Sequence, residues 1–524
     1  MGLIGVGLYF LLNGTAIGDQ VKEKAENITG KNETTGSSGV TSGNNNSSTS
    51  NTGANKVKNS GNDDDVLKVQ VFTWGGYAPG LYFNEGAQWS ERSRFYKDYG
   101  LKVEFVLIDD FEASRKAFEV DEVNLLGQET GAMNTEMERL AKYDPRVFIQ
   151  VDWSRGGDAV VVGRGIKTVN DLKGKKIAYG GYSPSVSFLA HMLESAGMDF
   201  NDVERIEVAS APDAANAFKS GKVDAAIVWS PDDLACVRAV PGSKVLQSTV
   251  DASNIIADVF MVKNEYVKNN SDKLAAFYEG WMKGAAEINS NKNNYKKAAK
   301  IMSELTGLPQ ADAEGMMSTV RLTTHGDNLD FFGQNVNFKG VTGESLYTKM
   351  GENFVKINQA PKSRPQWRAI SYAGAVQKAN LSGPAHKSEG QKNFKAPTAA
   401  DKTAPAISSK PISISFATGK FELGENAKTI IDLQFADVAK SYKNTRIRVE
   451  GNTDSVGNLD MNKKLSEKRA RSVADYLQKQ YNMSPNRFII VGNGPSKPVK
   501  GCEQNQNEAC KAKNRRTEFQ LVAG

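Results

Sequence analysis

Residues 451–470 read GNTDSVGNLDMNKKLSEKRA and place an acid, Asp454, between glycines just before a helical stretch. Asn462, Ser466 and Arg469 follow at intervals of four and three, so they share one stripe of that helix. Asp454 can approach the same stripe from the loop after a strand. A carboxylate and a guanidinium on opposite sides of a pocket would match a ligand that carries an ammonium and a carboxylate. The alternative is an exposed turn in which Asp454 caps the loop and Arg469 forms a surface ion pair.

The sequence around this stretch predicts a small α/β domain at the end of the chain. Strands are expected at 412–416, 446–451, 486–492 and 516–523, and helices at 426–442 and 459–481. The order βαβαββ predicts one sheet with both helices on one face. From Pro411 onward the chain has 19 Lys and Arg against 12 Asp and Glu, which favours an anionic partner. It has no zinc-finger, helix-turn-helix or aromatic-interleaved basic motif, so nucleic acid is not the expected partner.

These polar positions resemble the OmpA-like peptidoglycan-binding domain. The matching residues are Asn452-Thr453-Asp454, Gly457, Asn462, Leu465-Ser466, Arg469-Ala470 and Asn514-Arg515-Arg516. The resemblance covers 411–524 and implies that Asp454 and Arg469 bind the diaminopimelate of the peptide stem, with Thr453, Asn462 and Arg516 as supports. Asn452 departs from the family pattern, in which many members have His.

The three cysteines are Cys236, Cys502 and Cys510. In an exported chain the close pair, Cys502 and Cys510, indicates a small disulfide loop, whereas in a cytosolic chain two free thiols would be expected. The OmpA-like resemblance also implies this disulfide, because some members have such a loop. The sequence indicates no metal site, because no Cys or His lies near the pair at ligand spacing. No cofactor is expected.

The middle of the chain, 66–378, alternates strand and helix patterns, which is typical of parallel α/β sheets. Chain crossings are expected near 152–158 and 229–233, so the pattern predicts two lobes joined by short extended connections. The last part, 265–378, carries apolar residues at helical spacing and is expected to be mostly helical.

Three segments of this region resemble the type 2 periplasmic binding proteins of the nitrate, sulfonate and taurine ABC transporters. They are VDWSRGGDAVVV (151–162), KTVNDLKGKKIAYGGYSPSVSFLAHMLESAG (167–197) and AFKSGKVDAAIVWSPDD (217–233). The resemblance implies a two-lobed fold that closes over a small solute, and a transporter permease as a partner.

Candidate solute-binding residues lie where strands end, which is where open α/β sheets bind ligands. They are Trp74, Gly76, Tyr77, Asp158, Ser183, Ser185, Ser187, Trp229 and Asp232. The three serines and the start of their helix favour an anion. If Asp158 and Asp232 both face the cleft, a zwitterionic or cationic solute fits better than a bare oxyanion. Taken together, the serines and the two acids predict an anionic or zwitterionic solute. The alternative is that the serines are helix caps and that the two tryptophans belong to the core.

Two polar stretches are expected to be disordered. Residues 19–65, mostly Asn, Gly, Ser and Thr, form a tether, and 379–410 form a second linker. Residues 1–18 contain the apolar run LIGVGLYFLL, which is typical of a signal peptide or an N-terminal membrane anchor. Either interpretation places the rest of the chain in the periplasm, anchored to the inner membrane in the second case.

The expected function is therefore a cell-envelope solute-binding protein that is held to peptidoglycan. One alternative is a sensor or structural adaptor between inner membrane and cell wall. Another is an enzyme, because some relatives of the fold make the thiamine pyrimidine precursor. His191 and His325 belong to no nucleophile–base or metal pattern in the sequence, so an enzyme is the weaker hypothesis.

Overall fold

The computed structural model describes residues 65–524 except 415 and 418. The expected N-terminal segment 1–18 and all but the last residue of the tether 19–65 lie outside this range. Within the described residues, no helix combines the length and apolarity needed to span a bilayer.

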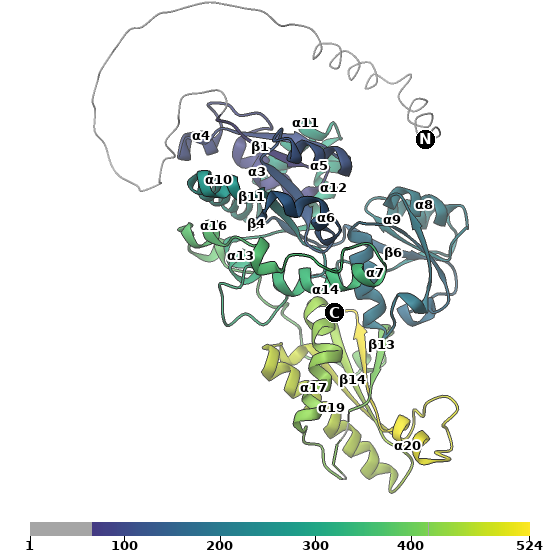
Figure 1. The fold of residues 1–524 in the computed structure, drawn as a ribbon. Helices are drawn as coiled ribbons and strands as arrows, with labels where there is room; N and C mark the ends of the chain where they lie inside the picture. The colour runs from purple at the N-terminus through teal and green to yellow at the C-terminus, as the bar shows by residue number, and fades with distance from the viewer. Residues whose placement is uncertain (1–64, 415, 418) are drawn as a thin grey trace, which may run out of the picture. The chain divides into compact units, whose positions relative to one another are not determined.

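The first lobe is built on a five-stranded sheet of order β2-β1-β3-β11-β4 (Figure 1). Its strands are β1 (Leu67–Val71), β2 (Val103–Leu107), β3 (Leu125–Glu129), β4 (Pro145–Gln150) and β11 (Asp258–Lys263). β1 pairs parallel with β2 and β3, while β11 is antiparallel to β3 and β4. Every residue of β3 is buried because helices cover both faces, as in α/β sheets generally.

Helices pack closely on this sheet. They include α3 (Ala78–Asn84), α4 (Arg94–Tyr99), α5 (Phe111–Glu119), α6 (Met133–Leu140) and α10 (Asn264–Ser290). A Cβ atom at Gly80 of α3 would come within 2.2 Å of the ring of Trp281 on α10. The two helices therefore meet at a distance that only glycine allows. Trp281 is fully buried and also packs on Phe260 of β11.

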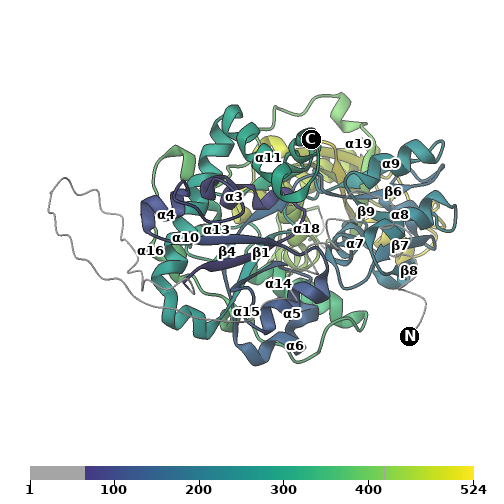
Figure 2. The ribbon, with the colours of Figure 1, turned by 90° about the horizontal axis from the view of Figure 1, so that it is seen from above.

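The second lobe has a five-stranded sheet of order β10-β6-β9-β7-β8 (Figure 2). Its strands are β6 (Asp158–Val162), β7 (Lys176–Gly180), β8 (Glu204–Val208), β9 (Ala225–Trp229) and β10 (Lys244–Ser248), and its helices are α7 (Pro184–Ser195), α8 (Ala211–Lys219) and α9 (Asp232–Ala239). β7 is parallel to β8 and β9, whereas β6 is antiparallel to β9 and β10. The expected parallel α/β character thus holds, with antiparallel strands added.

The chain crosses between the lobes twice. The first crossing runs from β4 through β5 (Asp152–Ser154) to β6, as predicted near 152–158. The predicted second crossing near 229–233 is wrong, because the chain there passes from β9 into α9 within the second lobe. The return lies at 249–257, between β10 and β11. The sequence does not reveal this return. The chain first forms β10, which pairs antiparallel with β6 at the edge of the second sheet, and only then leaves the lobe.

The region expected to be helical after the return is helical. Its elements are α10, α11 (Lys292–Thr306), α12 (Gln310–Ser318), α13 (His325–Phe331), α14 (Gly343–Lys356), α15 (Trp367–Ile370) and α16 (Gly374–Lys378). One short strand, β12 (Val320–Leu322), interrupts the helices and pairs with β5.

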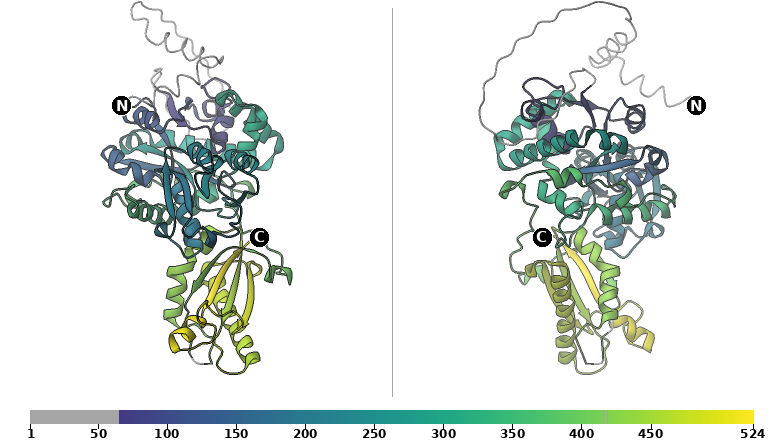
Figure 3. Two further views of the ribbon diagram at one scale, coloured as in Figure 1. Left: turned by 90° about the vertical axis from the view of Figure 1, so that its right-hand side faces the viewer. Right: turned by 60° about the vertical axis from the view of Figure 1, so that its left-hand side comes forward.

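The C-terminal domain has a four-stranded sheet of order β13-β16-β14-β15 (Figure 3). Its elements are β13 (Ala406–Ile412), α17 (Glu425–Ile431), η7 (Asp432–Ala436), α18 (Asp437–Ser441), β14 (Arg446–Asn452), α19 (Leu459–Tyr481), β15 (Phe488–Gly494), α20 (Glu508–Asn514) and β16 (Thr517–Val522). The predicted βαβαββ order is present, with α20 as an addition. The first strand is 406–412 instead of 412–416, because its pairing with β16 begins at Ala406.

Both long helical segments cover the same face of this sheet, as predicted. Phe435 of η7 stacks on Phe519 of β16, with ring centroids 4.0 Å apart. Val449 of β14 pairs with Phe519 and so points to that face. On β14, a Cβ atom at Gly451 would lie 2.1 Å from the carbonyl oxygen of Ser466 on α19. Glycine at 451 thus lets α19 lie directly on the strand, next to the loop that carries Asp454.

The expected disordered linker at 379–410 has defined structure in this chain. It contains η5 (Pro384–His386), η6 (Ala400–Lys402) and the first residues of β13. Between them, Glu389 accepts two hydrogen bonds from the guanidinium of Arg155, at 2.9 and 2.7 Å. Arg155 holds the pKa of Glu389 down to about 2, against the opposing effect of burial. The composition predicts disorder here because it contains no information on ion pairs with residues far away in the sequence, such as the pair of Glu389 with Arg155.

Candidate functional sites

A cavity of about 910 Å³ opens in the C-terminal domain between the loop after β14 and the first turns of α19. The five residues that the sequence assigns to peptidoglycan binding all line it: Thr453, Asp454, Asn462, Arg469 and Arg516. Basic side chains outnumber acidic ones on its walls, because Lys511, Lys513 and Arg515 add to the two arginines while Glu508 joins Asp454. The cavity therefore suits a ligand with at least one carboxylate.

Asp454 is held in one orientation at the edge of this cavity. Its Oδ1 accepts a hydrogen bond from the backbone N–H of Val456 at 3.1 Å. Its Oδ2 accepts one from Nη1 of Arg515 at 2.6 Å. The Arg515 side chain is 40% exposed and the Asp454 side chain 13% exposed, so this ion pair lies at the cavity surface.

Arg469 lies on α19, half-buried, with its guanidinium 4.8 Å from the ring centre of Phe416. Its Nε donates to the carbonyl oxygen of Lys420 at 3.0 Å. In the described part of the chain, no residue accepts a hydrogen bond from its Nη1 or Nη2. Burial and the nearby charge of Arg515 lower the pKa of Arg469, while Asp454 raises it. Arg469 is therefore fixed by its inner nitrogen and presents its outer edge to the cavity, where a carboxylate could accept two hydrogen bonds.

The three supporting residues are placed differently. Nδ2 of Asn462 donates to the carbonyl oxygen of Val456 and so closes the Asp454 loop. Thr453 is buried, and its Oγ1 has no hydrogen-bond partner among the described residues. Arg516 lines the cavity, but its guanidinium donates to Glu518 and to the carbonyl oxygen of Lys497. Ser466, on the same predicted stripe, joins α19 to β15 by accepting from the N–H of Gly494.

The residue that sequence reasoning missed as part of this site is Arg515. The sequence shows it only as the middle residue of the Asn514-Arg515-Arg516 motif, in which Arg516 is the expected support. The sequence offers one signal for the correct choice. Arg516 lies next to β16 and in phase with Glu518, with which it pairs two positions on, whereas Arg515 lies between α20 and the strand.

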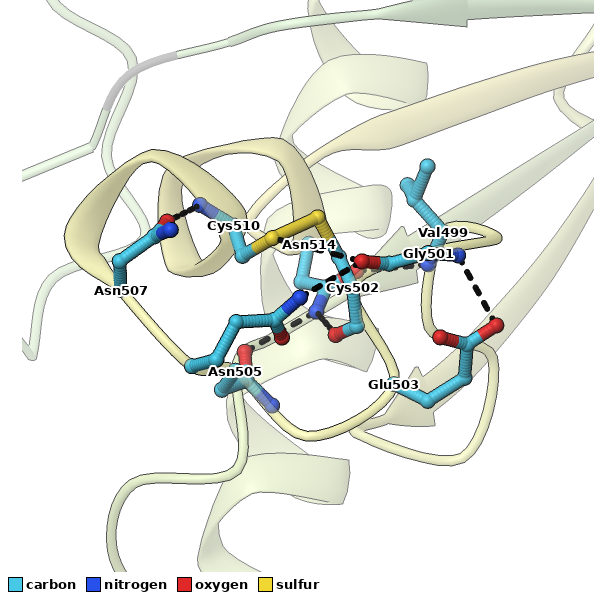
Figure 4. The surroundings of a disulfide bond; sticks show 9 residues. Val499, Gly501, Cys502, Glu503, Asn505, Asn507, Cys510 and Asn514 are labelled. Carbon is cyan, nitrogen blue, oxygen red and sulfur yellow. Dashed lines mark hydrogen bonds between the residues drawn. A yellow bond between two sulfur atoms is a disulfide. The ribbon is translucent and has the colours of Figure 1, made fainter.

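The predicted disulfide between Cys502 and Cys510 is present, and it closes a loop next to this site (Figure 4). Asn514 donates to the carbonyl oxygen of Cys502 and accepts from the N–H of Val499, which folds the loop against α20. Nδ2 of Asn505 in the loop donates to Oγ of Ser455, the residue after Asp454. The loop thus contacts the Asp454 turn and leads into α20, the helix directly before Arg515.

A second cavity, of about 300 Å³, lies between the two lobes of the middle region. The first lobe contributes Phe72, Thr73, Trp74, Tyr77, Asp109, Phe111, Arg115, Gln128, Glu129 and Ala132, the second lobe Asp158, Tyr182, Pro184 and Trp229, and the return crossing Ile256 with Asp258 at its end. Such a position, between lobes and at strand ends, is where open α/β folds bind small molecules.

Four of the nine residues that the sequence proposes for the solute line this cavity, namely Trp74, Tyr77, Asp158 and Trp229. The other five, Gly76, Ser183, Ser185, Ser187 and Asp232, are not among its lining residues. A Cβ atom at Gly76 would lie 1.6 Å from Oδ2 of Asp152, so this glycine makes room for that carboxylate. Ser183 caps α7 by accepting from the N–H of Ser185, while Ser185 and Ser187 are fully buried.

Carboxylates gather on and behind the walls of this cavity. Asp152 is buried, and its Oδ2 accepts a hydrogen bond from Nε1 of Trp74 at 2.7 Å. Burial raises the pKa of Asp152, Asp158 and Glu129 to about 7 in each case. Burial and then the negative charge of Asp152 raise the pKa of Asp258 well above its ordinary value.

Comparison with known proteins assigns the two regions. Residues 151–293 match the family described as NMT1/THI5 like, and residues 415–514 match the OmpA family. The chain joins an NMT1/THI5-like domain to a C-terminal OmpA domain. Neither match alone extends over half of the chain.

Two curated relatives each match one of the two domains. The outer membrane porin F of Pseudomonas aeruginosa is 38% identical over 112 residues, which are 21% of this chain and 31% of that protein. The putative aliphatic sulfonates-binding protein of Escherichia coli is 30% identical over 145 residues, which are 28% of this chain and 43% of that protein. The chain thus spans less than half the length of either curated relative.

Solved structures resemble the NMT1/THI5-like domain. The periplasmic aliphatic sulphonate binding protein SsuA of Escherichia coli aligns with a TM-score of 0.46 and 19% identity, over 64% of this chain and 97% of SsuA. The alkanesulfonate-binding protein SsuA of Xanthomonas axonopodis, bound to MOPS, aligns with a TM-score of 0.43 and 15% identity, over 59% of this chain and 99% of that one.

Proposed function

We propose that this chain is a periplasmic solute-binding protein of ABC-transporter type that is anchored to peptidoglycan by its OmpA domain. The OmpA domain would recognise the diaminopimelate of the peptide stem. The NMT1/THI5-like domain would bind a small solute between its lobes and deliver it to a permease. The sequence expectation of an anionic or zwitterionic solute agrees with the name of the Escherichia coli relative, which concerns aliphatic sulfonates. The membrane attachment of residues 1–18 stays a prediction.

The observation that carries the wall-binding proposal is the pair of opposite charges at one cavity. Asp454 is oriented by Val456 and Arg515, and Arg469 presents two nitrogens without acceptors in the described part of the chain. The side-chain centre of diaminopimelate carries an ammonium and a carboxylate on one carbon. Its ammonium would meet Asp454 and its carboxylate would meet Arg469 in a two-bond contact.

Binding, not catalysis, is proposed for the cavity between the lobes. His191 is buried on α7, where its Nδ1 contacts the carbonyl oxygen of Ser187, and burial lowers its pKa to about 4. His325 contacts the hydroxyl of Tyr278. Neither imidazole lines the cavity, so neither is placed to act as a base on a solute there.

The test of wall binding is co-sedimentation of the full chain with purified peptidoglycan sacculi. The unchanged chain should sediment, and Asp454→Ala and Arg469→Ala should each leave most of it in the supernatant. Arg471→Ala is the matched control, because Arg471 is an exposed arginine two positions further along α19 that pairs with Glu467. Equal sedimentation of all four proteins would refute the proposal.

A further inference from the structure

The cavity between the lobes combines carboxylates and aromatic rings. Asp109, Glu129, Asp158 and Asp258 line it, against a single basic side chain, Arg115. Six aromatic residues share the walls, namely Phe72, Trp74, Tyr77, Phe111, Tyr182 and Trp229. This composition is opposite in charge to the one that a sulfonate or another anion would need.

Two of the four carboxylates already have their partners. Glu129 accepts hydrogen bonds from the backbone N–H groups of Gly131 and Ala132, at 2.8 and 2.6 Å. Asp109 accepts from the N–H and the hydroxyl of Thr73, at 2.6 and 2.7 Å. These two acids are therefore held by the protein itself and need no ligand to satisfy their oxygens.

The other two carboxylates, Asp158 and Asp258, have oxygens that accept no hydrogen bond from the described residues. Asp158 is only 3% exposed, and its Oδ2 accepts a hydrogen bond from Oγ of Ser154 at 2.7 Å. Its Oδ1 has no hydrogen-bond partner in residues 65–524, and neither has the side chain of Asp258 in that range. A buried carboxylate oxygen without a donor, such as Oδ1 of Asp158, is costly, and a buried charge is normally paired; Asp258 is partly exposed. Both acids line the cavity, so the missing donor would come from whatever occupies it.

Arg115 does not offset these charges. Its Nε donates to Glu136 at 3.2 Å, its Nη2 to Gln128 at 3.0 Å and its Nη1 to Ser114 at 2.9 Å. It is 6% exposed and also packs over the ring of Phe111 at 5.1 Å. The charge of Arg115 is thus paired with Glu136, which lies outside the cavity, and the ring of Phe111 covers its guanidinium. Arg115 therefore offers few free donors to an incoming anion.

The start of α7, which the sequence favours as an anion site, does not supply donors either. Pro184 at the first helical position has no N–H, and the N–H of Ser185 is capped by Oγ of Ser183. Of this segment, only Tyr182 and Pro184 line the cavity.

The aromatic residues match a cation with an apolar body. Phe111 is 40% exposed and Tyr182 55% exposed, although both are large apolar side chains that border a cavity. Tyr182 also has a φ of +53°, a conformation that aromatic residues adopt rarely. Aromatic faces attract ammonium groups, and the attraction is strongest where water is excluded.

We propose that the solute of this cavity is an organic cation, with an ammonium or amidinium group between Asp158 and Asp258 and its apolar body against the aromatic rings. The proposal rests on the solute-binding function proposed above and replaces the anionic class with a cationic one. A volume of about 300 Å³ limits the solute to a small molecule.

The test is calorimetric titration of the full chain with a panel of matched probes. The cations are phenethylammonium, choline, putrescine and agmatine. The neutral partners of the first two are 2-phenylethanol and 3,3-dimethylbutanol, and the sulfonate arm is ethanesulfonate, an anion, with taurine, a zwitterion. At least one cation should bind, and at least tenfold more tightly than its neutral partner where the panel has one. Asp158→Asn and Asp258→Asn should each weaken that binding at least tenfold, while thermal melts confirm that both variants are folded.

The matched control is Asp232→Asn, since Asp232 is an acid of the second lobe that does not line the cavity. It should bind the cation as the unchanged chain does. Binding of ethanesulfonate or taurine without binding of any cation would overturn the cationic class and leave the solute-binding function standing. Binding of no member of the panel would overturn both. Cation binding that Asp158→Asn and Asp258→Asn leave unchanged would overturn the proposed seat of the ammonium group.

Discussion

Oδ2 of Asp454 accepts a hydrogen bond from Nη1 of Arg515 at 2.6 Å, and this contact joins the cavity of the C-terminal domain to the disulfide loop. Arg515 follows α20 directly, and its Nη2 donates to Glu508 at the start of that helix. The orientation of Asp454 therefore depends on a segment 61 residues further along the chain. Changes in that segment should affect peptidoglycan binding.

Reducing the disulfide should weaken wall binding without unfolding the chain. In the chain-entropy model, a bridge across this separation of 8 residues stabilises by about 2.5 kcal/mol. Without it, α20 and Arg515 are held less firmly against the Asp454 turn. We expect a Cys502→Ser, Cys510→Ser double variant to bind sacculi several-fold more weakly and to melt at a lower temperature. Unchanged sedimentation would show that the loop does not position the site.

Arg469→Lys should reduce affinity for sacculi about tenfold, because a lysine cannot form the two parallel hydrogen bonds of a guanidinium with a carboxylate. The lysine would also lose the contact with the ring of Phe416. Quantitative sedimentation over a range of sacculus concentrations measures the change. Arg471→Lys, the control on the same helix, should bind normally. If Arg469→Lys bound as tightly as the unchanged chain, charge alone would explain the role of Arg469.

Gly451→Ala should destabilise the OmpA domain by about 2 kcal/mol or more, since the new Cβ atom would lie 2.1 Å from the backbone oxygen of Ser466. The helix would have to move away from β14, and a backbone atom cannot rotate aside as a side chain can. Gly424→Ala is the control, because a Cβ atom there meets nothing within 4 Å. Its effect should stay within about 1 kcal/mol, because Gly424 is the N-cap of α17 and alanine is a poorer N-cap than glycine. Denaturant unfolding followed by the fluorescence or circular dichroism of each full chain tests the difference.

The acids around the solute cavity should make the ligand-free chain sensitive to pH. Asp158 has a folded pKa of about 7, above its ordinary value, so its protonated form stabilises the fold at low pH. That contribution is complete below the unfolded pKa of about 3.9 and is lost as pH rises through 7. Asp258, Asp152 and Glu129, which surround it, shift in the same direction, and the one nearby base is Arg115.

Asp158→Asn removes one of these titrations while keeping an acceptor for Ser154. The melting temperature of the variant, relative to the unchanged chain, should therefore rise from pH 5 to about pH 7 and then level off towards pH 8. Comparing the two chains at each pH cancels the opposite trend from His191, whose pKa is lowered to about 4. A constant difference across this range would mean that Asp158 does not titrate there.

Much of the fold follows from the sequence because it depends on local patterns. Alternating strand and helix signals predict both lobes, and apolar spacing predicts α10 through α16 and α19. The second chain crossing could not be predicted in this way. The turn after Trp229 looks like an exit from the sheet, and only the pairing of β10 with β6 keeps the chain in the second lobe.

The two sites differ in how far the sequence predicts them. One cavity is lined by Asp454, Asn462 and Arg469. The sequence predicts this because the last two share one face of α19 and a short loop connects Asp454 to that helix. The solute cavity is built from both lobes, so its residues meet through tertiary structure that spacing does not encode. The sequence predicts Trp74, Tyr77, Asp158 and Trp229 because each lies just after a strand, at its end or at the first chain crossing. It does not predict Asp258, because the return crossing that leads into β11 is not predicted either. It favours the serines of α7 because a helix start usually offers free N–H groups.

The most direct measurement is calorimetric titration of the full chain with two stem peptides that differ only in the third residue. One peptide carries meso-diaminopimelate and the other carries lysine, which keeps the side-chain ammonium and lacks the second carboxylate. We expect the diaminopimelate peptide to bind at least tenfold more tightly and Arg469→Ala to abolish that preference. Asp454→Asn should weaken the binding of both peptides, because both carry the side-chain ammonium. Equal binding of the two peptides by the unchanged chain, a preference that survives Arg469→Ala, or binding that Asp454→Asn leaves unchanged would contradict recognition of diaminopimelate by Asp454 and Arg469.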